Sequence, residues 1–203
     1  MLHLLISNKL KIIGGNQMHE LETRIMDIDV DKIRNILLDN GAEKVKSEDQ
    51  INDIYDFEDG RLLAQKGYAR IRTVNDKLND KIIYFMTTKK MLSQERFKVM
   101  EENETIINDK KAGEGIFKSL GLVLKESNKK YRESYKLNDC LIEIDINDKN
   151  FCPFPYLEIE TSSEENLESV VKFLGYTLDD TTSETIYEIL EKRGLLNNNP
   201  KGI

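Results

Sequence analysis

Charged residues recur at every second position in one segment after another of this 203-residue chain. Glu20, Glu22 and Arg24 begin the series, and Arg70 with Arg72 continues it. Successive side chains of a β-strand point to opposite faces, so this spacing places the charges of each segment on one face. The series therefore predicts a fold made mainly of strands, with one strongly charged face.

The positions between these charges are mostly apolar, as at Ile71, Ile144 and Ile159. Later members of the series are Lys89, Glu102, Glu104, Lys130, Arg132, Glu143, Asp145, Glu158 and Glu160. In a flat sheet the charged face would simply meet water. In a sheet closed into a barrel it could instead line a polar tunnel. The spacing alone leaves both arrangements open.

Hydrophobic periodicity and turn residues predict the individual elements. Strands are expected at 18–28, 45–57, 68–74, 81–90, 95–107, 129–136, 140–146 and 156–161. Helices are expected at 29–40, 61–66, 109–120, 164–174 and 182–192. Hairpin-connected strands with helices inserted between groups of them favour an α+β fold, in which helices cover an antiparallel sheet or barrel.

One domain is expected, from residue 18 to residue 196, followed by a flexible tail at 197–203. We expect residues 1–17 to be a mis-annotated or disordered extension. Gly14 and Gly15 would arise from translation of a purine-rich ribosome-binding sequence upstream of a true start at Met18. The apolar run within this extension is too short to cross a bilayer.

The net charge of −7 argues against a general binder of nucleic acid or of membrane surfaces. Cys140 and Cys152 show no metal-like spacing with the two histidines, so a zinc site is not expected. We interpret both cysteines as reduced thiols of a cytoplasmic protein.

A tunnel lined by both signs of charge would need an occupant, because buried like charges repel one another. Arginine and lysine side chains suit a chain of phosphates, which arginine can grip with two hydrogen bonds. Aspartate and glutamate suit hard divalent cations such as Mg²⁺ or Mn²⁺. A metal-bridged triphosphate would satisfy both sets together.

The ordered set of motifs resembles the CYTH domain, the family of triphosphate tunnel metalloenzymes. Glu20-Leu21-Glu22-Thr23-Arg24 is similar to its E-x-E-x-K strand, with arginine in place of the usual lysine. The later landmarks follow in order at residues 53–56, 69–72, 86–89, 102–104, 130–132, 144–145, 157–160 and 182–190. The length and the final motif resemble the class IV adenylate cyclase branch most.

The resemblance implies a closed eight-stranded antiparallel β-barrel with helices packed outside. Implied metal ligands, for Mg²⁺ or Mn²⁺, are Glu20, Glu22, Glu102, Asp145, Glu158 and Glu160. Implied triphosphate-binding residues are Arg24, Arg70, Arg72, Lys89, Lys130 and Arg132, of which Arg24 and Lys89 would also act in catalysis. Glu143 faces the same way but matches the family less securely.

Two reactions fit such a site. A cyclase would convert ATP into cyclic AMP and pyrophosphate, and a phosphohydrolase would cleave tripolyphosphate or thiamine triphosphate. The chain length and the final motif favour the cyclase. A third alternative is a polyphosphate- or nucleotide-binding module without turnover. The expected partner is one of these small triphosphates, with neither nucleic acid nor membrane, and a homodimer is left open.

Overall fold

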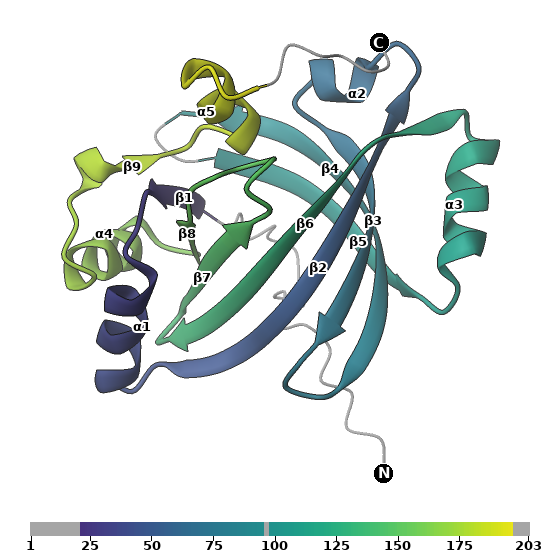
Figure 1. The fold of residues 1–203 in the computed structure, drawn as a ribbon. Helices are drawn as coiled ribbons and strands as arrows, with labels where there is room; N and C mark the ends of the chain where they lie inside the picture. The colour runs from purple at the N-terminus through teal and green to yellow at the C-terminus, as the bar shows by residue number, and fades with distance from the viewer. Residues whose placement is uncertain (1–20, 96–97, 197–203) are drawn as a thin grey trace, which may run out of the picture.

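The computed structural model describes residues 21–95 and 98–196. Nine antiparallel strands form one strongly curled sheet, shaped like a half-barrel, and the helices pack on its outside (Figure 1). The predicted α+β class, antiparallel sheet and external helices are confirmed. Residues 1–17 and 197–203, for which an extension and a tail were expected, lie outside the described residues, as does Glu20.

The sheet order is β5-β4-β3-β2-β6-β7-β8-β1-β9. In chain order the strands are β1 (Leu21–Met26), β2 (Glu43–Phe57), β3 (Tyr68–Asp76), β4 (Lys81–Gln94), β5 (Lys98–Ile107), β6 (Leu122–Leu137), β7 (Cys140–Asn147), β8 (Tyr156–Thr161) and β9 (Thr181–Thr182). The two-residue β9 was not predicted, because so short a segment carries no period. β1 also meets β5 at one pair, Glu22 with Lys98. One pair does not establish the expected closed eight-stranded barrel, so closure stays a prediction.

Most of the helices begin where a short polar side chain at the N-cap accepts hydrogen bonds from first-turn backbone N–H groups. Asp29, Asp109, Ser163 and Thr185 serve in this way. The helices are α1 (Val30–Asp39), α2 (Arg61–Ala64), α3 (Lys110–Ser119), α4 (Glu164–Phe173) and α5 (Ile186–Lys192), with a short 3₁₀ turn at Leu178–Asp180. None of the helices in the described ranges has the length and apolar character needed to cross a membrane.

The largest apolar core lies between the outer face of β1, β7 and β8 and the helices α1 and α4 (Figure 1). Ile142, Ile144 and Ile159 from the strands are fully buried there, together with Leu37 of α1 and Leu167 of α4. Each fully buried aliphatic side chain of this size contributes about 1.5–3 kcal/mol to folding. The apolar residues that alternate with the charged ones therefore determine which face of these strands points outward, toward the helices.

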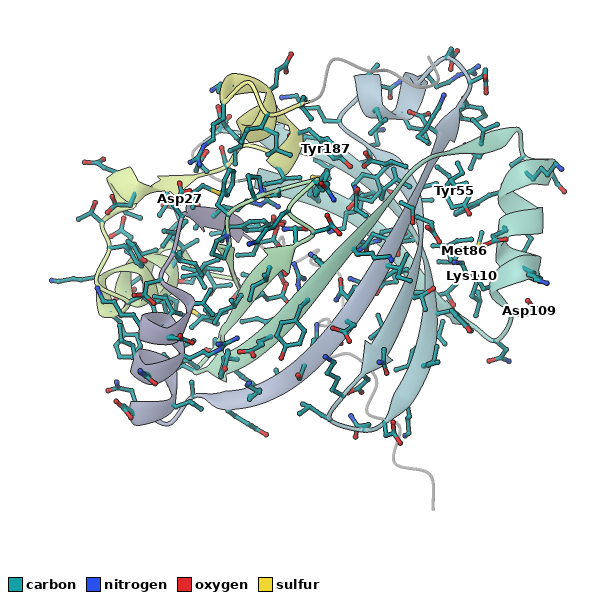
Figure 2. The ribbon with its side chains drawn as sticks, in the orientation of Figure 1. Asp27, Tyr55, Met86, Asp109, Lys110 and Tyr187 are labelled. Carbon is teal, nitrogen blue, oxygen red and sulfur yellow. The ribbon has the colours of Figure 1, made fainter. Side chains whose placement is uncertain are left out.

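Helix α3 covers another part of the same outer face, over β2 and β3 (Figure 1). Phe117 packs against Tyr55 with ring centroids 5.1 Å apart. The first helical residue, Lys110, places its Nζ 2.7 Å from Asp53 Oδ2, and Figure 2 shows Lys110 and Tyr55 between helix and sheet. Both helix-covered regions thus leave the other face of the sheet to the charged side chains.

Helix α5 and the segment before it lie across one end of the curled sheet (Figure 1). Leu190 packs with Tyr156 and Cys152, while Tyr187 donates a hydrogen bond to Glu126 on β6 (Figure 2). Gln94, the last residue of β4, donates to the carbonyl oxygen of Ser183 at 3.1 Å. The C-terminal segment therefore joins strands from distant parts of the sheet.

Candidate active site on the inner face of the sheet

The strand register gathers the predicted site residues on one face. Ser134, Glu143, Glu158 and Arg24 occupy directly opposed positions on β6, β7, β8 and β1. Opposed residues of antiparallel strands project from the same face. We call this the inner face, and it lies opposite the apolar cores. The same register places there Glu22, Arg70, Arg72, Lys89, Glu102, Lys130, Arg132, Asp145 and Glu160.

Three carboxylates on β7 and β8 converge. Glu143, Glu158 and Glu160 each offer one oxygen, and these atoms lie within 4.8 Å of one another. Glu143 and Glu158 are buried and Glu160 is half-buried. Burial and the nearby Glu143 and Glu22 raise the pKa of Glu160. We call Glu143, Glu158 and Glu160 the carboxylate triad.

Arg132 links this triad to the next position along β7. Its Nη2 lies 2.7 Å from Glu158 Oε2 and 2.5 Å from Asp145 Oδ2, and its Nη1 contacts Glu143. Lys130 Nζ lies 2.7 Å from the same Asp145 oxygen. The carboxylate of Asp145 therefore contacts two cations, Lys130 and Arg132. The guanidinium of Arg132 contacts three carboxylates.

Arg24 joins the triad from the other side. Its Nε donates to Glu158 at 2.9 Å, its Nη2 contacts Glu158 and Glu22, and its Nη1 donates to the carbonyl oxygen of Glu184 at 2.8 Å. Burial alone would lower the pKa of Arg24, but Glu158 and Glu22 raise it above its ordinary value. Arg24 is thus a permanent cation held next to the carboxylates.

A second group of charges lies across β3, β4 and β5. Glu104 accepts from Arg72 at 2.9 Å and from Thr87 at 2.7 Å, and it lies 3.4 Å from Arg70. Lys89 Nζ lies 3.0 Å from Glu102 Oε2. Glu102 therefore lies among cations here and is not part of the carboxylate triad.

The two sides of the inner face differ in their electrostatic balance. Burial and the neighbouring Arg70 lower the pKa of Arg72, and burial with Arg132 lowers the pKa of Lys130. Around the triad, burial with the nearby Glu143 and Glu22 raises the pKa of Glu160, whereas Arg132 and Lys46 outweigh burial and lower the pKa of Glu143. The cations of the first region would attract an anion, and the carboxylates of the second a cation.

Unpartnered polar atoms mark the same face. Within the described residues, Arg70 Nε, Arg72 Nε, Gln50 Oε1, Asn52 Oδ1 and Asn147 Nδ2 are buried without a hydrogen-bond partner. Leaving such an atom unpaired costs about 1–3 kcal/mol. The two guanidinium nitrogens extend the donor set of the cation-rich side.

Several features of this site were missed from the sequence. Glu143 was left outside the predicted ligand set, although it belongs to the triad. Tyr156 is buried on the inner face, where burial and the nearby Asp145 and Glu158 raise its pKa well above the ordinary value. The alternation of β8 could have placed Tyr156 on the same face as Glu158. The pairing of β8 with β7 is what places it opposite Asp145.

The triad fits a hard divalent cation. Mg²⁺ and Mn²⁺ prefer carboxylate oxygens, and three of these converge here from two strands. A bound cation would stabilise the charged form of Glu160, whose pKa burial and the nearby Glu143 and Glu22 raise. Two further carboxylates lie next to the triad. Asp145 shares Arg132 with Glu158, and Glu22 shares Arg24 with Glu158.

The family assignment follows from comparison with known domains. The model of the CYTH domain matches residues 18–184, most of the chain and all strands of the sheet. This chain belongs to the CYTH family. The resemblance inferred from the ordered motifs is therefore confirmed. Comparison of the whole sequence with curated proteins gives no match.

Solved structures support the CYTH fold. A Pyrococcus horikoshii protein, PH1012, is 22% identical with a TM-score of 0.68, covering 83% of this chain and 98% of its own. A Vibrio parahaemolyticus protein, provisionally described as an adenylate cyclase, is 16% identical with a TM-score of 0.69, covering 85% and 98%. The Hippeastrum protein HpAC1, described with a dominant triphosphatase activity, is 18% identical with a TM-score of 0.63, covering 91% and 100%. At these identities the likeness concerns the fold.

Proposed function

We propose that this CYTH protein is a divalent-metal-dependent enzyme that cleaves a triphosphate bound to the inner face of the sheet. The observation that carries the proposal is the position of Arg132, whose Nη2 lies 2.7 Å from Glu158 of the carboxylate triad and 2.5 Å from Asp145. Cationic side chains and the carboxylate triad are thus contiguous. A polyphosphate bridged by a metal ion matches this arrangement.

Glu143, Glu158 and Glu160 would hold Mg²⁺ or Mn²⁺, with Glu22 and Asp145 beside them. When bound, the metal supplies neutralisation of phosphate charge and activation of the attacking oxygen. These carboxylates also raise the pKa of Arg24 and of Arg132 against the effect of burial.

The cations of this chain would bind and orient the phosphates. Arg70 and Arg72 carry unpartnered buried Nε atoms, which are donors available to phosphate oxygens. Lys130 and Lys89 each contact a carboxylate that a phosphate could replace. Fixed cations near the leaving phosphates stabilise the charge that develops there as the P–O bond breaks.

Our first candidate reaction is cyclisation of ATP to cyclic AMP and pyrophosphate, which the terminal motif favours and which agrees with the description of the Vibrio protein. The second is hydrolysis of tripolyphosphate or thiamine triphosphate, favoured by the triphosphatase activity described for the Hippeastrum protein. In the first reaction a ribose hydroxyl attacks the α-phosphorus, and in the second a water attacks the terminal phosphorus. The same metal and cations serve both.

A product assay distinguishes these reactions. The full chain is given ATP, tripolyphosphate and thiamine triphosphate separately, first with Mg²⁺ and then with Mn²⁺. Cyclic AMP with pyrophosphate supports the cyclase, whereas orthophosphate released fastest from tripolyphosphate supports the phosphohydrolase. Absence of turnover with every substrate and both metals would overturn the proposal and leave the binding module.

A further inference from the structure

Ser134 on β6 contacts the carboxylate triad but has no role in the site described so far. It lies directly opposite Glu143 on β7 and, on its other side, directly opposite Lys46 on β2. Ser134 is fully buried, with an exposed fraction of 0%, and its Oγ donates a hydrogen bond of 2.8 Å to Glu143 Oε1. A buried hydroxyl group is therefore held against one of the three carboxylates that converge.

Glu143 receives donors of two kinds. Arg132 Nη1 contacts Glu143 Oε2, and Lys46 Nζ lies 3.5 Å from Glu143 Oε1. These two cations outweigh burial and lower the pKa of Glu143, so they hold the carboxylate in its ionised form. Ser134 adds no charge. Its contribution is to fix the position of one carboxylate oxygen.

The three donors differ in how firmly they hold Glu143. The guanidinium of Arg132 also contacts Asp145 and Glu158, so its position depends on three carboxylates together. Lys46 has a long, flexible side chain that is partly exposed. The hydroxyl oxygen of a serine is bonded directly to Cβ, so a single staggered torsion relates it to the strand backbone. Ser134 is therefore the most rigidly placed donor to Glu143.

A neutral donor at this position is compatible with a bound metal ion. Each carboxylate oxygen has two lone pairs, and one hydrogen bond from a hydroxyl occupies only one of them. A cation in the place of Ser134 would repel a divalent ion, whereas a hydroxyl carries no net charge. Glu143 can therefore keep its hydrogen bond from Ser134 while it binds a metal.

We infer that Ser134 is a positioning residue, which orients Glu143 as a ligand of the divalent metal. Hydrogen bonds from neighbouring groups commonly orient ligating side chains, and loss of such a partner weakens metal binding about 10–100-fold. The inference rests on the proposed function, because it requires that the triad bind the metal. Neither Ser134 nor Glu143 belongs to the motif positions that carry the family resemblance.

Ser47 on β2 offers a matched comparison. It is also buried, with an exposed fraction of 8%, and its Oγ lies 2.8 Å from the hydroxyl oxygen of Tyr131. Lys46 reaches the triad on the inner face, so the next residue, Ser47, points to the outer face. Ser134→Ala and Ser47→Ala therefore remove the same group and a hydrogen bond of the same length from opposite faces of the sheet.

The test measures binding of Mn²⁺ to the full chain by titration calorimetry, without any triphosphate. We expect Ser134→Ala to raise the dissociation constant about tenfold or more, and Ser47→Ala to leave it unchanged. Urea unfolding in metal-free buffer checks that both variants fold and compares their stabilities. In a Glu143→Ala background, Ser134→Ala should have no further effect on Mn²⁺ binding, because the hydroxyl acts through the Glu143 carboxylate.

Equal Mn²⁺ affinities of the Ser134→Ala protein and the unaltered protein would overturn the inference and leave the proposed function intact. Equal losses in the two serine variants, or a Ser134→Ala chain that does not fold, would assign Ser134 a structural role and also overturn it. So would a further loss of affinity in the Glu143→Ala background. If Glu143→Ala abolishes binding, the two serine variants decide alone. An unaltered protein that binds no Mn²⁺ would refute the metal site of the proposed function, and the inference with it.

Discussion

Arg24 on the first strand donates a hydrogen bond of 2.8 Å to the backbone carbonyl of Glu184, 160 residues later in the chain. The same guanidinium donates through Nε to Glu158 at 2.9 Å and contacts Glu22 through Nη2. A lysine, usual at this position in the family, has a single nitrogen and could not reach all of these acceptors. The departure from the family motif therefore connects the carboxylates with the segment that leads into α5.

Arg24→Lys should keep the charge but lose the bond to Glu184. We expect the free energy of unfolding to fall by about 1–3 kcal/mol, as for loss of a hydrogen bond to a charged group. Arg24→Met should cost about 3–5 kcal/mol, because it removes one of the cations that pair with the buried carboxylates of Glu22 and Glu158. Urea denaturation in metal-free buffer measures both. Arg61→Lys, at an exposed ion pair with Asp59, is the control, and an equal effect there would contradict this explanation.

Glu160→Gln should change stability in opposite directions with and without metal. Burial and nearby carboxylates raise the pKa of Glu160, so a neutral amide should leave the metal-free protein as stable as before or more stable. The variant should lose the added stability that Mn²⁺ gives, about 2.7 kcal/mol at a hundred times the dissociation constant. Thermal unfolding with and without Mn²⁺ checks this.

Glu165→Gln, at an exposed position of α4, is the control for that experiment. Its metal-dependent gain in stability should equal that of the unaltered protein. An undiminished gain in the Glu160→Gln protein would exclude Glu160 from the metal site.

Glu133 should make the protein sensitive to acid. Burial alone would raise its pKa, but hydrogen bonds from Arg34, Tyr135 and Tyr131 lower the pKa of Glu133 to about 2. An unfolded chain has a glutamate pKa of about 4.3, so this contribution is present above that pH and disappears as the pH falls toward 2. Glu133→Gln should therefore lower the free energy of unfolding at pH 7 by about 1–3 kcal/mol.

The same variant should also flatten the decline in stability between about pH 5 and pH 2, the range set by the two pKa values. Urea unfolding across this range measures the slope. Glu191→Gln, exposed on α5, should leave it unchanged. A slope for Glu133→Gln identical to that of the unaltered protein would assign the acid sensitivity to other groups.

Lys130→Gln should weaken triphosphate binding far more than it weakens the fold. Burial and Arg132 lower the pKa of Lys130, while Asp145 raises it, so an added phosphate would stabilise the charged lysine. A lost charge-assisted hydrogen bond of about 1.5–3 kcal/mol corresponds to a KM about 10–150 times higher. Lys129→Gln alters the exposed residue next to it on β6 and should leave KM within twofold. Steady-state kinetics with tripolyphosphate makes the comparison, and equal KM values for the two variants would contradict the assignment.

The sequence was sufficient to predict which face each charge occupies. Alternation is a local property of a strand, so Glu143 and Asp145 could be separated from Ile142 and Ile144 without knowing any partner strand. The helices were predicted for the same reason, because their caps and apolar spacing are local. β6 begins seven residues earlier than expected, at Leu122. Residues 122–124 form an apolar run without alternation and residues 125–128 are polar, so this part carries no period of two.

Neighbours across strands could not be predicted in this way. The register of β2 against β6 shifts between Lys44 and Lys46 and again between Ile54 and Tyr55. Such irregularities decide which residues face one another, and alternation carries no trace of them. The register of β7 against β8 and of β4 against β5 is likewise not set by alternation, so the sequence did not show that Glu143 would join Glu158 and Glu160, or that Glu102 would lie beside Lys89.

Strands β7 and β8 carry apolar side chains on one face and the carboxylate triad on the other, so their two faces constrain the register jointly. A slip of one residue would expose Ile142 and Ile144 and bring Glu143 and Asp145 against α4. A misregistered pairing of β7 with β8 therefore has a much higher free energy than the native one. This preference acts during folding and does not depend on substrate. In a random mutagenesis screen for activity, substitutions under α1 and α4 should therefore score alongside those of the site itself.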